Sequence, residues 1–468
     1  MNNQATQPVS QLPGYITSAV PNPRDKRAPW YKNTAPTYAG IFLWFVFWQD
    51  AAKASTPGGT LAQGVGWALF SLVIAAFVCH FLFYLVPGLL GMKTGLPLYI
   101  VGTSTFGAQG GFLMPGFLMG VLQFGWVGVN VYFSSRALGA MIPIDARIIM
   151  VIWGALAAFM GLKGIQYVAR VATYLPLIPL VVLLWLTAST IGNVGSFKPE
   201  ALIAAQTAAS PTGPAALSMM GVLAMMLTYV VGFFATAGAA GVDFGLNSRD
   251  GKDVSMGGLI GIALAIIVTA GLSLLIVAGT YGGPGIDATA TNKLSLSSFE
   301  LIPTILGPDT AKWVMFLLAV AAFPPACFSA FIAANSFRTT LPKVNPFISV
   351  GIGTAVSVIL AITGLVAKAI SVFVIIGASF GPICGAMLVD YLLSGKKWSG
   401  PRAGFNPAGW VAWAAGFVVG ILPNLGVNVP AAPVLAFVVG AVVYFLCAKM
   451  GMLSPVVPVS GSLAEATK

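Results

Sequence analysis

The chain has 468 residues, of which 57% are hydrophobic and only 7% are charged, and its formal net charge is +11. A soluble globular protein carries about 25% charged residues, so this composition excludes a soluble globular fold. The sequence instead predicts an all-α integral membrane protein.

Runs of roughly 20 apolar residues predict membrane-spanning helices. Twelve such runs follow one another, at about 38–61, 66–90, 109–134, 146–164, 171–193, 216–245, 255–280, 312–336, 346–366, 369–394, 405–423 and 430–450. They form one domain, 38–450, between two polar ends. Residues 1–37 and 451–468 are expected to be cytoplasmic tails, and residues 454–468 are expected to be disordered.

Lys and Arg residues set the predicted orientation, because cytoplasmic loops carry an excess of them. With twelve spans and the N-terminus inside, sixteen of the 23 Lys and Arg face the cytoplasm, six face outward, and Lys53 alone lies within a span. The first 37 residues contain no apolar run, so they do not form a signal peptide. We expect a multi-pass protein of the cell (inner) membrane with both termini cytoplasmic. No nucleic-acid partner is needed to explain the positive charge.

The first span is interrupted by polar and helix-breaking residues. Its apolar run ends at Trp48, and Gln49, Asp50, Lys53 and the sequence TPGG at 56–59 follow. Charged groups and irregular backbone occur at membrane depth where the chain lines a cavity or is buried in protein. The interruption therefore predicts a transport site. Asp50 and Lys53 are spaced to pair with each other, and a structural and a functional role are both open.

A second interruption is predicted in the sixth span, where GFFATAG at 232–238 precedes Gly241 and Asp243. It lies five spans after the first, and an odd number of helices inverts the topology of a repeat. We therefore expect two inverted five-helix repeats, at about 38–193 and 216–394, followed by two helices at 405–450. The alternative is that these glycines only allow helices to pack closely.

Few other polar groups lie in the spans. Asp243 and Asp390 are expected to cap helices or to pair with nearby bases, Asp390 with Lys396 and Lys397. His80 is expected to be packed rather than to relay protons. The four cysteines match neither a metal site nor a disulfide framework and are expected to be small packing residues: Cys79, Cys327, Cys384 and Cys447.

Three polar or aromatic residues of the third span share one helical face, because Gln123, Trp126 and Asn130 are three and four residues apart. An indole beside two amides suits a flat heteroaromatic ring, since the indole stacks on the ring and the amides bind its edge. The alternative is an aromatic residue with interhelical hydrogen bonds. In the eighth span, Pro324 and Pro325 release backbone carbonyls that can bind a cation or a neighbouring helix.

Several motifs occur in an order that resembles the nucleobase–cation symporter-1 family, which includes the cytosine permeases and the hydantoin permease. They are KTGL at 93–96, QFGWVGV at 123–129, GFFAT at 232–236, DF at 243–244, GPI at 381–383 and DYL at 390–392. The resemblance covers about residues 38–450. It implies the leucine-transporter-like fold, with two inverted five-helix repeats, two further helices, and alternating access around a site at the membrane midplane.

The resemblance also implies a substrate site. Trp126 falls on the family's stacking tryptophan, Gln123 matches a glutamine of cytosine permease, and Asn130 falls where the hydantoin permease has a substrate-binding glutamine. Phe234 replaces or matches the second aromatic residue that closes over the ring. Asn335 ends an Ala-Ala-Asn sequence whose Asn contacts substrate in the family.

A cation site built from backbone and hydroxyl oxygens is implied at Ala51, Ala326, Ser329 and Ala330. Ala330 stands where the family has a second hydroxyl, and the Lys53 ammonium lies where a fixed charge can replace a sodium ion. We therefore predict proton coupling through Asp50 and Lys53, with sodium as the alternative coupling ion. No organic cofactor and no certain metal site is predicted.

These features predict a secondary permease for a nucleobase such as cytosine or a purine, or for a related heterocycle. The alternatives are a sodium-coupled symporter of a related heterocycle or vitamin precursor, an amino-acid or organic-cation carrier, and a transporter-like nutrient sensor. A phosphate-binding loop and a catalytic constellation are both missing, so an enzyme is not predicted. The expected partners are the heterocycle and the lipid bilayer, with no obligate protein partner.

Overall fold

The computed structural model describes residues 12–42, 51–52, 56–172, 174–284 and 296–466. Ten helical segments among these residues are long and apolar enough to cross a membrane. They are Gly64–Thr94, Phe112–Gly139, Ala146–Lys163, Ile165–Ser196, Met219–Ala239, Gly251–Tyr281, Pro308–Thr340, Ala369–Leu393, Pro407–Leu425 and Ala432–Lys449. Each coincides with a predicted span, so the chain is an all-helical, multi-pass membrane protein.

Two predicted spans are not among the ten. Helix α18 (Pro346–Ile362) is apolar but has 17 residues. Helix α2 (Thr34–Phe42) precedes residues 43–50, which lie outside the described residues, as does Lys53. Asp50 belongs to residues 43–50 and therefore also lies outside the described residues. The count of twelve spans therefore stays a prediction.

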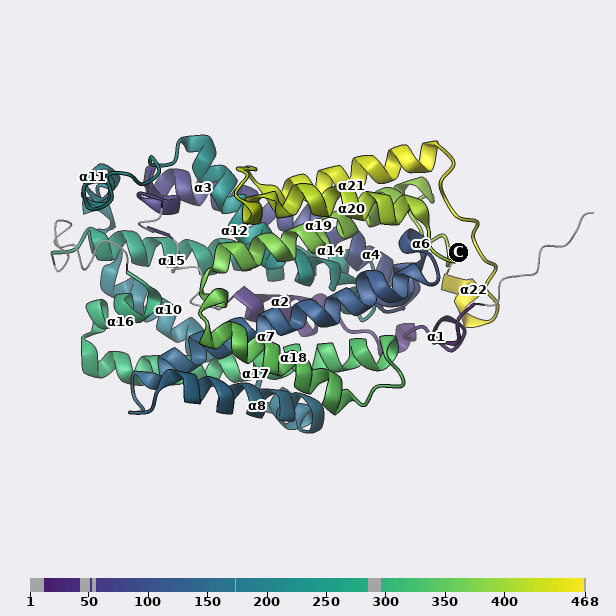
Figure 1. The fold of residues 1–468 in the computed structure, drawn as a ribbon, viewed down its shortest axis with the longest axis horizontal. Helices are drawn as coiled ribbons and strands as arrows, with labels where there is room; N and C mark the ends of the chain where they lie inside the picture. The colour runs from purple at the N-terminus through teal and green to yellow at the C-terminus, as the bar shows by residue number, and fades with distance from the viewer. Residues whose placement is uncertain (1–11, 43–50, 53–55, 173, 285–295, 467–468) are drawn as a thin grey trace, which may run out of the picture.

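The spanning segments contain the following α-helices, all but α9 labelled in Figure 1. They are α3 (Gly64–Val78), α4 (Leu85–Thr94), α7 (Leu118–Gly139), α8 (Ala146–Lys163), α9 (Ile165–Ala172), α10 (Leu177–Thr190), α12 (Met219–Ala239), α14 (Gly251–Gly258), α15 (Ala265–Tyr281), α17 (Pro308–Thr340), α19 (Ala369–Leu393), α20 (Pro407–Ile421) and α21 (Ala432–Lys449). Turns of π-helix at Cys79–Tyr84, Phe112–Phe117 and Leu259–Leu264 begin or join three of the segments.

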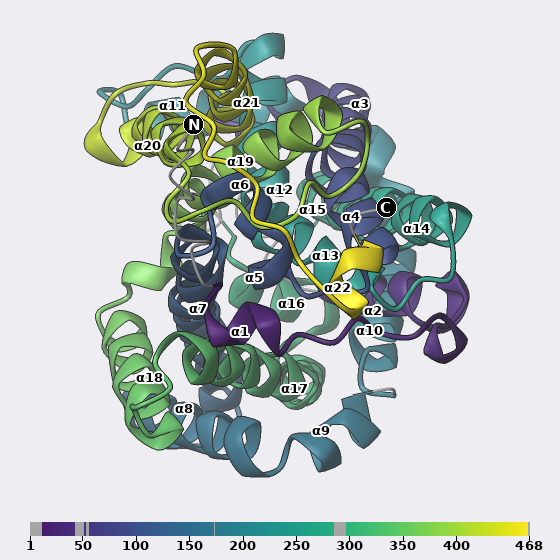
Figure 2. The same cartoon turned by 90° about the vertical axis from the view of Figure 1, so that its right-hand side faces the viewer.

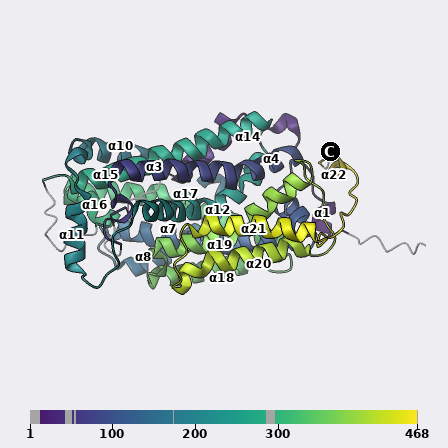
Figure 3. The same cartoon turned by 90° about the horizontal axis from the view of Figure 1, so that it is seen from above.

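The helices pack as two groups. Helices α7, α8, α17 and α18 all contact one another, and we call them the α7 group. Helices α2, α3, α12 and α15 form the α12 group, in which α3 contacts α12 and α15 and α2 contacts α15. Figure 3 shows α12 between α3 and the α19–α21 helices, and α19 contacts both α12 and α7. The two groups therefore have α19 as a common neighbour.

A glycine lets two helices of the α7 group approach closely. A Cβ atom at Gly161 of α8 would lie 2.6 Å from the carbonyl oxygen of Cys327 in α17, which is closer than real Cβ contacts allow. Cys327 and the three other cysteines are buried and free, as expected of packing residues.

The described N-terminal residues fold against one end of the bundle (Figure 2). Ile16, in α1 (Gly14–Thr17), is fully buried in the main core. The Arg27 guanidinium donates hydrogen bonds to the carbonyl oxygens of Asn22, at 2.9 Å, and Met92, at 2.5 Å. Residues 12–33 are thus a packed segment of the fold.

The described C-terminal residues return to the same end of the bundle (Figure 2). The Val457 amide donates to the Pro401 carbonyl at 2.8 Å, and Leu463, in α22 (Ser462–Ala466), is buried. The prediction of a disordered C-terminal tail is therefore wrong for these residues. This short segment packs against hydrophobic residues at the end of the bundle, and its composition alone does not indicate that contact.

Two short helices, α11 (Pro199–Ala209) and α16 (Ser298–Leu306), lie at the opposite end of the bundle (Figure 1). The Gln206 side chain of α11 accepts a hydrogen bond from the Gly58 amide at 2.7 Å and donates one to the Ala52 carbonyl at 3.0 Å. Helix α11 therefore holds the interrupted part of the predicted first span, 38–61.

Asp390 does not pair with Lys396 or Lys397 as predicted. Its Oδ1 lies 3.1 Å from Nη2 of Arg402, and the Tyr444 hydroxyl donates to the same oxygen at 2.8 Å. Asp390 and Arg402 are both buried, whereas the two lysines are exposed. The prediction is wrong because the nearest bases along the chain point to solvent, while a base twelve residues away folds back onto the carboxylate.

Asp243 caps a helix, which was one of its two predicted roles. It lies in α13 (Gly241–Gly245), and its Oδ1 accepts the Leu98 amide at the start of α5 (Leu98–Val101) at 3.0 Å. The nearby Arg249 pairs with Asp253 instead, at 2.7 Å.

Candidate functional site

Trp126 connects the α7 group to the α12 group. Its indole N–H donates to the Thr236 hydroxyl of α12 at 3.2 Å. The Trp126 ring lies 5.0 Å from the Phe233 ring at 79° and 5.8 Å from the Phe373 ring of α19 at 35°. Phe233 and Phe373 also contact each other edge-to-face, at 5.4 Å. We call these three aromatic residues and Thr236 the Trp126 cluster.

Two amides lie on α7 within two turns of helix that include Trp126, as the sequence spacing predicts. Asn130 is 4% exposed and donates from Nδ2 to the Trp126 carbonyl at 2.9 Å. Its Oδ1 is buried and has no hydrogen-bond partner among the described residues. Gln123 is 7% exposed and donates to the sulfur of Met119, a weak acceptor, at 3.5 Å. The face therefore presents a buried carbonyl oxygen without a donor.

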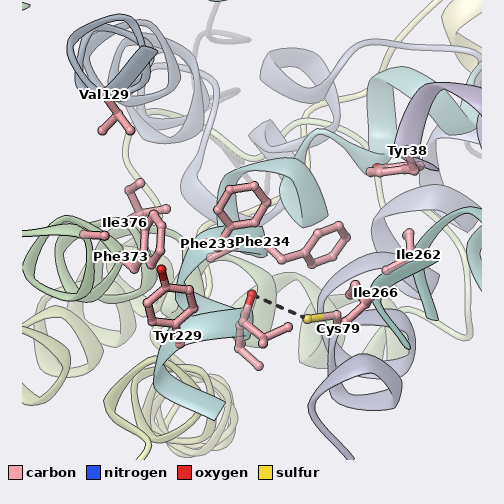
Figure 4. Packing of buried hydrophobic residues seen from close by; sticks show 14 of the residues in the cluster. Tyr38, Cys79, Val129, Tyr229, Phe233, Phe234, Ile262, Ile266, Phe373 and Ile376 are labelled. Carbon is pink, nitrogen blue, oxygen red and sulfur yellow. Dashed lines mark hydrogen bonds between the residues drawn. The ribbon is translucent and has the colours of Figure 1, made fainter. Parts of the chain in front are cut away.

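The structure places Phe233, rather than the predicted Phe234, beside Trp126. Figure 4 shows Phe233 next to Phe373, with Phe234 directed toward Tyr38 on another side of α12. The Phe234 ring is fully buried and lies 5.8 Å from the Tyr38 ring. Consecutive residues of a helix point about 100° apart, so only one of the two phenylalanines can face α7.

The predicted break in the sixth span is wrong for residues 232–238. Helix α12 is continuous from Met219 to Ala239, and the chain turns only at Ala240, before α13. A Cβ atom at Gly232 would lie 2.6 Å from the Phe373 carbonyl oxygen. Gly232 therefore serves close packing of α12 on α19, which was the alternative interpretation.

The polar and small residues of α17 do not join the Trp126 cluster. Asn335 is exposed, and among the described residues its side chain takes no part in the hydrogen bonds and ring contacts around Trp126. Ala326 is fully buried against Ala157 and Val168, and Ser329 is also buried. Helix α17 runs without interruption through its two prolines.

The Ala51 carbonyl, predicted to bind a cation, already has two donors. It accepts hydrogen bonds from the Thr60 hydroxyl at 3.2 Å and from the Leu61 amide at 3.1 Å. A carbonyl oxygen has two lone pairs, so both are occupied. Asp50 and Lys53, the other residues of this prediction, lie outside the described residues.

Sequence reasoning missed four residues near Trp126: Phe233, Thr236 and Phe373, which contact it, and Tyr229, which contacts Phe373. Tyr229, Phe233 and Thr236 are spaced at i, i+4 and i+7 along α12, and this spacing shows that they share a face. The Tyr229 ring lies 5.0 Å from the Phe373 ring. Phe373 carries no such signal, because only the fold brings α19 to this position.

The chain is similar in sequence to two cytosine permeases of Escherichia coli, from strain K12 and from O157:H7. Each is 23% identical to it over 342 residues, which are 73% of this chain and 74% of the permease. No family model matches the chain.

Its fold is similar to that of Mhp1, a transporter described as a member of the nucleobase-cation-symport-1 family. The inward-facing conformation of Mhp1 matches with a TM-score of 0.62 and 14% identity, over 94% of this chain and 96% of Mhp1. The closed conformation with bromovinylhydantoin bound matches at 0.61 and 16%, over the same shares. A Na⁺-coupled sialic acid symporter matches at 0.52 and 12%, over 92% of each chain. The resemblance predicted from the motifs is thus confirmed as a likeness to cytosine permeases in sequence and to Mhp1 in fold.

Proposed function

We propose that the chain is a secondary permease that imports a nucleobase, such as cytosine or a purine, or a related planar heterocycle, by alternating access. The sequence similarity to cytosine permeases and the Mhp1-like fold both support this proposal. The Trp126 cluster supports it as well, because a site between two helix groups is accessible from either side when the groups move relative to each other.

The observation that carries the proposal is the unpaired Oδ1 atom of Asn130, whose Nδ2 donates to the backbone carbonyl of Trp126 one helical turn earlier. A buried acceptor without a donor costs about 1–3 kcal/mol, and a ligand that supplies an N–H removes this cost. Nucleobases carry ring N–H groups or exocyclic amines at the edge of a ring that stacks on an indole.

The proposal is tested by the melting temperature of the purified protein with each of a panel of nucleobases, hydantoins and amino acids. We expect at least one nucleobase to raise it. Asn130→Ala is expected to weaken binding of that base by roughly twofold to tenfold through the loss of one hydrogen bond, and to change the ranking of bases. Asn424→Ala is the control, because Asn424 is exposed and bonds Ser371 outside the Trp126 cluster. Stabilisation by amino acids alone, or an unchanged ranking in Asn130→Ala, would contradict the proposal.

We further propose that protons, rather than sodium ions, couple to transport through Asp50 and Lys53. The occupied Ala51 carbonyl supports this, as do the apolar surroundings of Ala326 and the methyl group at Ala330 where a sodium site would use a hydroxyl. Sodium coupling is the alternative, and a structural pairing of Asp50 with Lys53 is compatible with both.

Replacing sodium by choline is expected to leave the initial rate of uptake into proteoliposomes nearly unchanged, whereas an inward proton gradient is expected to raise it. Lys53→Ala should remove the response to the gradient, because alanine has no amine to exchange a proton with Asp50. Lys198→Ala, which removes an exposed lysine before α11, is the control. Strong stimulation of the parent protein by sodium would refute proton coupling.

A further inference from the structure

An apolar groove runs along the outside of the α7 group, between α8 and α18. Residues 151–162 of α8 and 347–362 of α18 line it, and its volume is about 580 Å³. Thr354 is the only lining residue with a polar side chain. The rims are open, since Phe159 is 56% exposed and Ile359 is 59% exposed. We call it the α8–α18 groove.

The groove is long enough to hold the acyl chain of a lipid in one leaflet of a bilayer. A helix rises about 1.5 Å per residue, so the lining part of α18 extends roughly 22 Å. The hydrocarbon of one leaflet is about 15 Å deep, half of the usual core thickness. An acyl chain can therefore lie along the groove with its headgroup at one end.

One end of the α8–α18 groove is basic. Lys163 is the last residue of α8, and its Nζ lies 5.2 Å from the ring of Phe347, which lines the groove. Lys343 is exposed, lies three residues before α18, and adds a second positive charge at this end. Arg338, in the last turn of α17, lies five residues before Lys343. The sequence has no Asp or Glu at 146–199 or 310–389. The helices that form this end therefore carry no acidic group to neutralise its charge.

We propose that the α8–α18 groove binds an acyl chain of an anionic phospholipid whose phosphate lies against Lys163 and Lys343. Basic pockets between membrane helices are suited to anionic headgroups, and the apolar walls are suited to the chain. A second copy of the protein is a poorer occupant, because a two-fold axis along the membrane normal would bring the same lysines of both copies together. This site is separate from the Trp126 cluster.

The test is a native mass-spectrometric titration of the detergent-purified protein with dioleoyl phosphatidylglycerol and dioleoyl phosphatidylcholine, which differ only in the headgroup. Each lysine near a headgroup is worth about fivefold in affinity, so we expect roughly thirtyfold tighter binding of the anionic lipid. The double variant Lys163→Gln/Lys343→Gln should lose most of this preference. Lys449→Gln is the matched control, because Lys449 also ends a span and lies 5.5 Å from a phenylalanine ring, that of Phe445.

A second variant tests the groove itself. Gly351 lines it, and a Cβ atom there meets nothing within 4 Å, so the side chain of Gly351→Leu has room to begin in the groove and occupy part of it. The variant should lose most of the binding of both lipids. The proposal is overturned if the double lysine variant keeps the preference for phosphatidylglycerol, or if Gly351→Leu binds lipid as the parent does. Conversion of a dimer to a monomer by Gly351→Leu, with lipid binding unchanged, would assign the face to a second copy instead.

Discussion

Trp126→Ala is expected to weaken nucleobase binding by roughly tenfold to a hundredfold, because stacking of a base on an aromatic ring contributes about 1–3 kcal/mol. The variant also removes the indole N–H that bonds Thr236 and so loosens the contact between the α7 and α12 groups. Equilibrium binding of a radiolabelled base to the purified protein measures the change.

Two further variants separate the roles of Trp126. Trp126→Phe keeps an aromatic face and should retain much of the binding, whereas Thr236→Val removes only the hydroxyl that accepts the indole hydrogen bond. We expect Thr236→Val to bind within about tenfold of the parent, the upper value for one ordinary hydrogen bond. A folded Trp126→Ala variant with unchanged affinity would place the substrate elsewhere.

Arg402→Met is expected to cause the largest loss of stability. Asp390 would lose its charged partner in a buried place and retain only the Tyr444 hydroxyl and, at 3.4 Å, the Thr105 hydroxyl as hydrogen-bond donors. Removal of one partner of a buried ion pair costs about 3–5 kcal/mol. Arg402 also donates to the Ser104 carbonyl at 2.8 Å, so the variant loses a link between two segments of the bundle end. The melting temperature in detergent measures the loss.

Charge compensation distinguishes this pair from general packing. The double variant Asp390→Leu/Arg402→Met should recover part of the lost stability, because no unpaired charge remains buried. Lys397→Met, at one of the bases that sequence proximity predicts as the partner, should melt like the parent because Lys397 is exposed. Equal destabilisation by Lys397→Met and Arg402→Met would show that the ion pair is not specific.

The fold follows largely from patterns that lie close together in the sequence. Apolar runs place the spanning helices, and the spacing of Gln123, Trp126 and Asn130 correctly puts them on one face of α7. The role of a glycine cannot be predicted in the same way, because a glycine that breaks a helix and one that packs against a backbone carbonyl have the same local sequence. Gly232 belongs to the second kind.

The parts that could not be predicted depend on contacts between distant segments. Phe373 reaches Trp126 from α19, and Arg402 reaches Asp390 after the chain has turned back on itself. The choice between Phe233 and Phe234 required the rotation of α12 about its axis, which a family motif does not specify to one residue. Local periodicity contains none of this information.

Counterflow in proteoliposomes tests the central claim most directly. Vesicles that contain the purified protein are loaded with the unlabelled nucleobase that stabilises it best, and then diluted into the same base in radiolabelled form. We predict transient accumulation of label that empty vesicles and vesicles with Trp126→Ala do not show. A base that binds tightly but never accumulates would contradict a permease and would favour a transporter-like sensor.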